Sequence, residues 1–326
     1  MPIRLIATFA LAFTAISGAA EDVRTMQYTP RSPEAARAWQ EDVREALFER
    51  LRLTDLVKSR GEISLEPQIA KTEERDGFVL EHVRIQSTGE RSIAAVVARP
   101  LKVEGPSPAV VCIHGHGGDR FTPFNASARQ YKLFGTELVR RGFIVISTDV
   151  GQHKVYEQGR TLMGERLWDL MRCVDYLESL PEVDPNRIGC AGLSLGGEMA
   201  MWLAAMDERV KTTVSAGFLT IMDQMEQNHC MCWKFDGLRE LVDFADIYSL
   251  IAPRRLQCQN GLKEPPTQFI VPLAEKAMKE IRLIYEDLGR AENVDLEVHD
   301  GAHEIALEPL IELFSTHLAD QKRAAR

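Results

Sequence analysis

The sequence predicts an α/β protein with a mostly parallel central sheet and helices on both of its faces. Short apolar runs, typical of strands buried on both faces, alternate along the chain with stretches of helical spacing. One such run leads through a glycine-rich turn containing Ser194 directly into a helix. With 326 residues, 45% hydrophobic and 27% charged, the chain is long enough to bury one large core.

Residues 1–20 predict a secretory signal peptide. Arg4 supplies the positive start, residues 5–16 form an uncharged and mostly apolar run, and residues 17–20 are all small. That run is too short for a comfortable membrane span, and no other segment has the uninterrupted apolar run of about 18 residues that a span needs. We therefore expect an exported protein, periplasmic or secreted, with no stable membrane insertion once the signal is removed. The alternative is an uncleaved N-terminal anchor.

An N-terminal helical extension is expected over residues 21–76. Ser32 suits an N-cap and Pro33 the first turn of a helix, which then carries apolar residues near helical spacing as far as Val57. The extension is predicted to precede a catalytic domain over residues 77–326.

The catalytic domain is predicted to open with an antiparallel hairpin and to continue with alternating strands and helices. The hairpin strands are Phe78 to Gln86 and Ile93 to Arg99. The later strand runs are Pro108 to Ile113, Phe143 to Ser147, Arg187 to Ala191, Val210 to Val214, Arg255 to Cys258 and Val294 to Val298. The expected helices are Ala126 to Arg141, Leu162 to Leu180, Gly197 to Met206, Leu273 to Leu288 and Glu304 to Leu318.

An insertion at about residues 219–244 interrupts this alternation. It is too long for a simple turn and is rich in sulfur and aromatic side chains, including Cys230, Cys232 and Trp233. Such a segment suits an excursion that folds over the mouth of a pocket. The alternative is a packing flap that never contacts a substrate.

Ser194 is the candidate nucleophile. It stands in Gly192-Leu193-Ser194-Leu195-Gly196, between a predicted strand and a predicted helix. A sharp strand-turn-helix elbow needs glycines on either side of the nucleophile, so that the backbone can turn and the helix can approach the strand. The pentapeptide alone is a weak signal, and its structural context is what favours catalysis.

A serine nucleophile needs a base and an acid, which in this arrangement follow it in the order acid, then histidine. His303 comes after the last predicted strand and immediately before the final helix, where a base can reach the elbow; His299 lies within the strand run and is expected to be structural. Glu264 is the carboxylate in the loop after the preceding strand. Asp223, just beyond an earlier strand, is the rival acid.

The loop at residues 114–118, HGHGG, follows a buried strand and is the candidate oxyanion loop. Its glycines free the backbone to turn amide groups toward a developing negative charge. We expect the backbone N–H groups of His116 and Leu195 to form the oxyanion hole. His114, Gly115 and Trp233 are candidates for the substrate pocket.

No metal or organic cofactor is predicted. His114 and His116, together with His153, could be interpreted as metal ligands, but without acidic or cysteine ligands at usable spacing the signal is weak. Six cysteines in a chain of this length do not make a disulfide framework, and we expect at most one bridge. The net charge of −9, without a block of basic residues, argues against nucleic acid as a partner.

Taken together, the motifs resemble those of the α/β-hydrolase superfamily, and more narrowly those of the dienelactone-hydrolase-like and acetyl-xylan-esterase-like exported esterases. HGHGG at 114–118, GLSLGG at 192–197, DIYSLIAPRRL at 246–256 and DGAH at 300–303 carry this resemblance, which extends from about residue 78 to the C-terminus. Dienelactone hydrolases have cysteine where this chain has Ser194, which argues against dienelactone as the substrate. Glu264 stands where the family usually has aspartate.

The resemblance implies a serine carboxylester hydrolase with a Ser-His-Glu triad, acting through an acyl-enzyme on acetyl or similar esters of carbohydrates. One alternative is a serine peptidase of the prolyl-oligopeptidase type. Such peptidases usually have an aromatic residue after the serine and a preceding propeller domain, whereas this chain has Leu195 and a short N-terminal region. A second alternative is a catalytically silent binding protein on the same scaffold.

Overall fold

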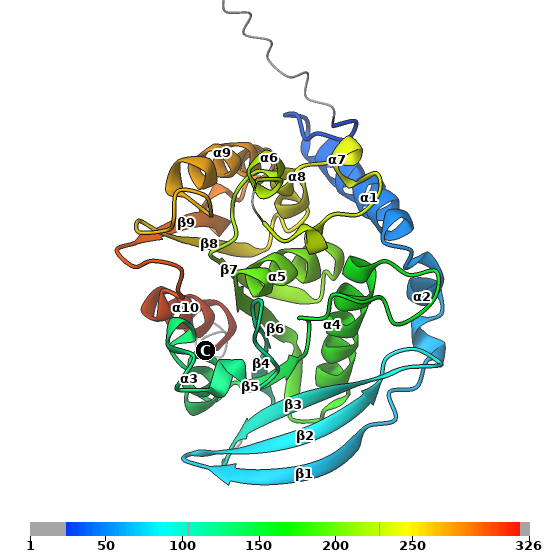
Figure 1. Ribbon diagram of the computed structural model, residues 1–326, viewed down its shortest axis with the longest axis vertical. Coiled ribbons are helices and arrows are strands. Elements are labelled where there is room, and N and C mark those ends of the chain that lie inside the picture. The colour runs from blue at the N-terminus through cyan, green and yellow to red at the C-terminus, as the bar shows by residue number, and fades with distance from the viewer. Residues whose placement is uncertain (1–23, 103–104, 228, 320–326) are drawn as a thin grey trace, which may run out of the picture.

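The computed structural model describes residues 24–102, 105–227 and 229–319. A nine-stranded sheet forms the centre of this part of the chain (Figure 1). Its strand order is β1-β2-β3-β5-β4-β6-β7-β8-β9. The strands are β1 (Gln68–Arg75), β2 (Phe78–Gln86), β3 (Ser92–Pro100), β4 (Ser107–Ile113), β5 (Ile144–Thr148), β6 (Val183–Leu193), β7 (Val210–Ala216), β8 (Arg255–Gly261) and β9 (Val294–His299).

The sheet is antiparallel at one end and parallel through the remainder. β1, β2, β3 and β5 pair antiparallel in succession, whereas β5, β4, β6, β7, β8 and β9 are parallel neighbours. β4, β5 and residues 188–193 of β6 are nearly continuous buried runs because helices cover both of their faces, whereas β7, β8 and β9 carry polar residues as well. The predicted fold class, a mostly parallel sheet with helices on both sides, is therefore confirmed.

Alternate residues of the central strands enter two separate apolar cores, one on each face of the sheet. Val111 belongs to one core and its neighbours Val110 and Cys112 to the other. Helices α3 (Phe134–Arg140) and α10 (Leu307–Phe314) cover the smaller core and lie side by side (Figure 1). The helices over the larger core are α1 (Pro33–Arg50), α4 (Leu162–Ser179), α5 (Leu195–Met206), α8 (Phe244–Ser249) and α9 (Val271–Asp287).

The N-terminal extension packs on the larger core instead of forming a separate body. Ser32 caps α1 as predicted, because its side chain accepts a hydrogen bond from the Ala35 N–H. The expected single helix to Val57 is broken near Arg52, whose φ is +58°, and resumes as α2 (Thr54–Lys58). The amide of Gln40 then donates to two backbone carbonyls beside α8.

β1 lies in the stretch that the sequence assigned to the helical extension, yet it forms the edge of the sheet. Half of its residues, QIAKTEER, are charged, and most are exposed. Charged side chains on an edge strand discourage pairing with other chains, and they also remove the apolar alternation by which a strand is recognised. The sheet therefore begins at Gln68, and the expected boundary at residue 77 falls inside the β1–β2 hairpin.

Between β7 and α8 the chain makes an excursion that contains only short helices. These are α6 (Met222–Met225), a 3-10 turn at Met231–Trp233 and α7 (Leu238–Leu241). We call residues 219–243 the excursion. It leaves the carboxyl end of β7, the same edge of the sheet at which β6 delivers Ser194.

The proposed signal peptide, residues 1–20, lies outside the described residues. Among the residues that the structure does describe, no helix is long and apolar enough to cross a membrane.

Candidate active site

Ser194 stands on a strained turn between β6 and α5. Its φ of +63° and ψ of −124° are unusual for a residue other than glycine, and such strain clusters at functional sites. A Cβ at Gly192 would lie 2.3 Å from the Gly196 carbonyl oxygen, and one at Gly196 would lie 2.2 Å from that of Ile113. The close approach of α5 to β4 and β6 therefore requires both glycines. Ser194 itself remains partly accessible to solvent.

His303 and Glu264 form a hydrogen-bonded pair. His303 Nδ1 lies 2.9 Å from Glu264 Oε1, and the Glu264 side chain is only 1% exposed, against 29% for His303. A carboxylate accepts the hydrogen bond from Nδ1–H, so this contact fixes the tautomer whose Nε2 can accept a proton. The arrangement is the one that a base and its orienting acid require.

Two backbone hydrogen bonds hold the loop of Glu264 against the loop of His303. The Leu262 N–H donates to the His299 carbonyl oxygen at 2.9 Å, and the Lys263 N–H donates to that of Gly301 at 3.0 Å. A Cβ at Gly261 would lie 2.3 Å from the Ala302 carbonyl oxygen. The end of β8 can approach the second loop this closely because residue 261 is glycine.

Gly217 and Phe269 position the His303 ring near the elbow. Gly217, at the end of β7, has φ +56°, and a Cβ there would lie 2.9 Å from His303 Cε1 and 3.0 Å from Leu193 Cδ1. Leu193 immediately precedes Ser194. The Phe269 ring stacks on the imidazole with centroids 5.6 Å apart. The structure thus brings the imidazole and the elbow to the same small region at the carboxyl edge of the sheet.

The other acid and the other histidine have different partners. Asp223, in α6, forms an ion pair with Arg239 within the excursion. His299 Nδ1 accepts a hydrogen bond from the Gly301 N–H at 3.2 Å, and burial lowers the pKa of this histidine. Glu264, and not Asp223, is therefore the carboxylate that contacts His303.

Gly115 packs against the nucleophile, and Tyr131 anchors it there. A Cβ at Gly115 would lie 3.2 Å from Ser194 Cβ. The Gly115 N–H donates to the Tyr131 hydroxyl at 2.7 Å, and the Gly118 N–H donates to the Gly115 carbonyl oxygen at 3.1 Å. Two amides of the loop are thus engaged within the protein. The His116 amide lies between them, which is consistent with its predicted role beside Ser194.

The Leu195 amide is the second proposed oxyanion donor. Leu195 is the first residue of α5, and the first amides of a helix have no acceptor within the helix. This N–H group directly follows the nucleophile, so it is available to a substrate oxygen at Ser194.

All three pocket candidates are buried. His114 is 0% exposed; its Nδ1 lies 2.8 Å from the Gly115 carbonyl oxygen, and its Nε2 accepts from the Val150 N–H at 3.0 Å. Burial lowers the pKa of His114, so the neutral ring acts as a fixed strut for the oxyanion loop. Trp233 is 1% exposed and packs on Phe244. Of the three, only Gly115 lies against Ser194.

A cleft of about 640 Å³ lies beside the oxyanion loop. Gly117 and Gly118 form one side of it, and Tyr156, Arg91 and Asp149 are among its polar lining. Neither Ser194 nor His303 lines this cleft. Gly117, which lines the cleft, is two residues after Gly115, which packs against Ser194. The cleft therefore lies next to the candidate catalytic residues and does not enclose them.

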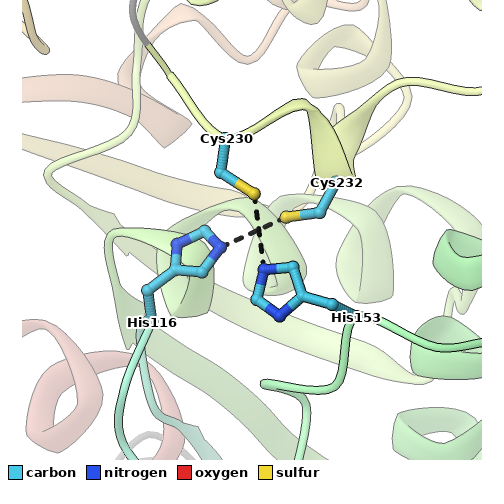
Figure 2. Close-up of side chains that lie close together, drawn as sticks. All are labelled: His116, His153, Cys230 and Cys232. Carbon is cyan, nitrogen blue, oxygen red and sulfur yellow. Dashed lines mark hydrogen bonds between the residues drawn. The ribbon is translucent and has the colours of Figure 1, made fainter.

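The His116 side chain points toward His153, Cys230 and Cys232 (Figure 2). Partial desolvation, followed by the positive charge of the nearby Arg166 guanidinium, lowers the pKa of His116 to about 4. His116 is therefore a neutral imidazole at physiological pH. These four side chains are the candidate metal ligands among the described residues.

Sequence reasoning missed the supporting residues of the site. Tyr131, Gly217, Gly261 and Phe269 are distant in sequence from the groups they position, and none belongs to a recognisable motif. Of the four, the two glycines carried the clearer signal, since each lies three residues beyond the end of a predicted strand run. A glycine at such a point often allows another backbone or ring to approach closely.

Comparison with known proteins agrees with this architecture. Residues 93–228 match the dienelactone hydrolase family. The chain is 29% identical over 274 residues to "Putative hydrolase YtaP" of Bacillus subtilis (strain 168), a match that covers 76% of this chain and 89% of the other. The matched region contains the predicted oxyanion loop at residues 114–118 and the turn that carries Ser194.

Two solved structures share the fold. A "putative acetyl xylan esterase" from Bacteroides fragilis superposes with a TM-score of 0.71 at 20% identity, covering 85% of this chain and 79% of the other. A glucuronoyl esterase of carbohydrate esterase family 15 from Caldicellulosiruptor kristjansonii superposes with a TM-score of 0.64 at 18% identity, covering 90% and 87%. The fold is that of the α/β-hydrolases.

Proposed function

We propose that this chain, which has the α/β-hydrolase fold and matches the dienelactone hydrolase family over residues 93–228, is a serine carboxylesterase with a Ser194–His303–Glu264 triad. The observation that carries the proposal is the buried Glu264 carboxylate, 2.9 Å from Nδ1 of His303, beside a serine with φ +63°. Taken by itself, each of these two features lowers the stability of the fold, because the first buries the Glu264 carboxylate and the second strains the backbone at Ser194. Together they make a nucleophile, a base and an orienting acid.

In the proposed reaction the Ser194 hydroxyl oxygen attacks the ester carbonyl carbon while His303 Nε2 takes the hydroxyl proton. The carbonyl oxygen becomes an oxyanion that accepts hydrogen bonds from the His116 and Leu195 amides. Collapse of this intermediate expels the alcohol, which receives the proton from His303, and leaves an acyl-enzyme. A water molecule then attacks the acyl carbon, His303 takes its proton and returns it to Ser194, and the carboxylic acid departs.

The substrate that we propose is an acetyl or similar ester of a carbohydrate. The structural neighbours described above carry the names of an acetyl xylan esterase and a glucuronoyl esterase, both of which refer to carbohydrate esters. The cleft beside the oxyanion loop is far larger than an acetyl group needs, and polar side chains line it. We infer that the alcohol part of the ester lies in the cleft, where Arg91, Asp149 and Tyr156 can bind hydroxyl groups. We also propose export of the chain, on the basis of residues 1–20.

A matched pair of serine variants tests the esterase assignment. Ser194→Ala should abolish turnover of p-nitrophenyl acetate. Ser127→Ala alters an exposed loop serine, and this variant should hydrolyse the same ester at the wild-type rate. Full activity of Ser194→Ala would overturn the assignment. A panel of acetylated, feruloylated and methylated sugar esters then tests the substrate class, and faster cleavage of short peptides than of any ester in the panel would contradict it.

A further inference from the structure

Four soft ligand groups converge beside the candidate active site (Figure 2). His116 comes from the loop after β4 and His153 from the loop after β5, whereas Cys230 and Cys232 come from the excursion. Their ligand atoms all lie within 4.8 Å of one another. Two pairs are already in contact: Nε2 of His116 lies 3.2 Å from Sγ of Cys232, and Nε2 of His153 lies 3.3 Å from Sγ of Cys230.

This geometry is close to what a tetrahedral metal ion requires. Zinc binds histidine nitrogen at about 2.0–2.1 Å and cysteine sulfur at about 2.3 Å, so ligand atoms around one zinc ion lie about 3.3–3.8 Å apart. The two contacts of 3.2 and 3.3 Å are near that range, and the remaining ligand atoms are at most 4.8 Å apart. Shifts of about 1 Å in exposed side chains would complete the tetrahedron.

The chemical types of the ligands also suit zinc. Two cysteines and two histidines form one of the standard structural zinc sets, and two thiolates with two neutral imidazoles balance the charge of Zn²⁺. Both imidazoles present the same nitrogen, Nε2, to the centre. Direct bridging of Cys230 to Cys232 would instead require a disulfide between residues only two apart, which proteins rarely form.

We propose that His116, His153, Cys230 and Cys232 bind a structural zinc ion that fastens the excursion to the oxyanion loop. All four coordination positions are filled by protein in such a site, which leaves none for water or substrate. The zinc ion thus holds the fold of the site and takes no part in the reaction. This proposal departs from the expectation of no metal, because the structure brings His116 and His153 together with the two cysteines, while His114 is held elsewhere.

Arg166 supports this assignment from outside the ligand set. Its guanidinium Nη1 lies 3.5 Å from Sγ of Cys232, and its Nη2 donates to the Gln152 carbonyl oxygen, next to His153. Arg166 comes from α4 and is 0% exposed. A rigid cation therefore contacts one ligand and the neighbour of another, the kind of outer contact that orients metal ligands and stabilises a thiolate.

Zinc content and cobalt absorption test the proposal directly. The full-length protein is prepared in the presence of a reductant and dialysed first against Zn²⁺ and then against metal-free buffer. Its zinc content is then measured by elemental mass spectrometry. We expect one zinc ion per chain. Replacement by Co²⁺ should give sulfur-to-cobalt charge-transfer absorption. Wild-type protein that retains no zinc, or cobalt absorption without the sulfur band, would overturn the proposal.

Variants identify the ligands. Loss of an outer partner of a metal ligand already lowers affinity roughly 10–100-fold, so His153→Ala should weaken zinc binding at least that much, and the double variant Cys230→Ser with Cys232→Ser should retain none. His229→Ala changes a histidine of the same excursion outside the set and should bind one zinc ion. Equal binding by the double variant, or equal loss in His229→Ala, would contradict the ligand assignment. If the variants do not fold, the wild-type cobalt spectrum decides.

The effect of zinc on activity rests on the proposed function, because His116 also supplies the proposed oxyanion amide. The metal measurements do not depend on it. A protein that binds one zinc ion through the cysteines but cleaves no ester would contradict the esterase and leave the zinc site intact. An active esterase that binds no zinc would contradict the zinc site and leave the esterase assignment intact.

Discussion

Glu264 Oε1 lies 2.9 Å from His303 Nδ1, and the loops that carry the two residues follow the adjacent parallel strands β8 and β9. The carboxyl ends of neighbouring parallel strands meet at the same edge of the sheet, so residues 39 positions apart become partners. The contact is nearly closed to solvent on the Glu264 side, which strengthens it electrostatically.

Removing the charge of Glu264 should lower kcat and leave KM nearly unchanged. In Glu264→Gln the amide can no longer stabilise the imidazolium that forms in the transition state, and it can hold the ring in the wrong tautomer. We expect a fall in kcat of roughly 10²–10⁴-fold. Glu264→Asp keeps the charge but shortens the side chain and should lose less. Steady-state kinetics with p-nitrophenyl acetate measures both, and equal activity of Glu264→Gln and wild type would contradict the role.

A methyl group at residue 261 should separate the acid from the base. In Gly261→Ala the new Cβ meets the Ala302 carbonyl oxygen at 2.3 Å, so one of the two loops must move. A misplacement of about 1 Å can cost roughly 100-fold in rate. Gly89→Ala is the matched control, since a Cβ there has open space around it. We expect kcat to fall in the first variant only; similar kcat values in both would refute the argument.

Loss of the Tyr131 hydroxyl should weaken the oxyanion loop. Tyr131→Phe leaves the buried Gly115 N–H without its acceptor, at a cost of about 1–3 kcal/mol. The loop must then turn, and the His116 amide turns with it, so kcat should fall at least roughly tenfold. Tyr285→Phe removes a buried hydroxyl that donates to the Arg254 carbonyl oxygen, away from the site. That variant should lose stability but keep kcat, and an unchanged kcat in Tyr131→Phe would count against the assignment.

Glu198 should make stability depend on pH. Burial raises the pKa of Glu198 in α5 to about 8, only partly opposed by the Arg166 guanidinium. Between its ordinary pKa and about 8 the folded state holds a proton that the unfolded state has lost, so the free energy of unfolding falls as pH rises.

The matched variant Glu198→Gln lacks this titration. Relative to wild type it should gain roughly 1 kcal/mol for each pH unit in that window. Urea unfolding of both proteins at pH 5.5 and pH 7.5 checks the prediction. If the two profiles stay parallel, Glu198 is not a buried carboxyl group of raised pKa.

The sequence alone predicted the strands that face two cores and the residues that stand in motifs. β4 and residues 188–193 of β6 are continuous buried runs. Ser194 directly follows β6, and His303 stands in the short turn between β9 and α10. β1 was not predicted, because an exposed edge strand carries no apolar alternation. Tyr131 could not be predicted either, since its contact with Gly115 depends on how the chain folds between β4 and β5.

The cluster around His116 was visible only in fragments. The pattern showed His114, His116 and His153 as a weak metal set, and it showed Cys230 and Cys232 only as part of a segment rich in sulfur and aromatic side chains. Cys230 stands 77 residues from His153 and Cys232 stands 116 from His116. Pairings at such separations are decided by the path of the excursion over the edge of the sheet, which no local pattern encodes.

The central claim, that Ser194 is an activated nucleophile, is tested most directly by labelling with a fluorophosphonate probe followed by mass spectrometry of the intact and digested protein. We predict one adduct per chain, located on Ser194 and absent from Ser194→Ala. Folded wild-type protein that never labels, or an adduct that persists in Ser194→Ala, would contradict the account.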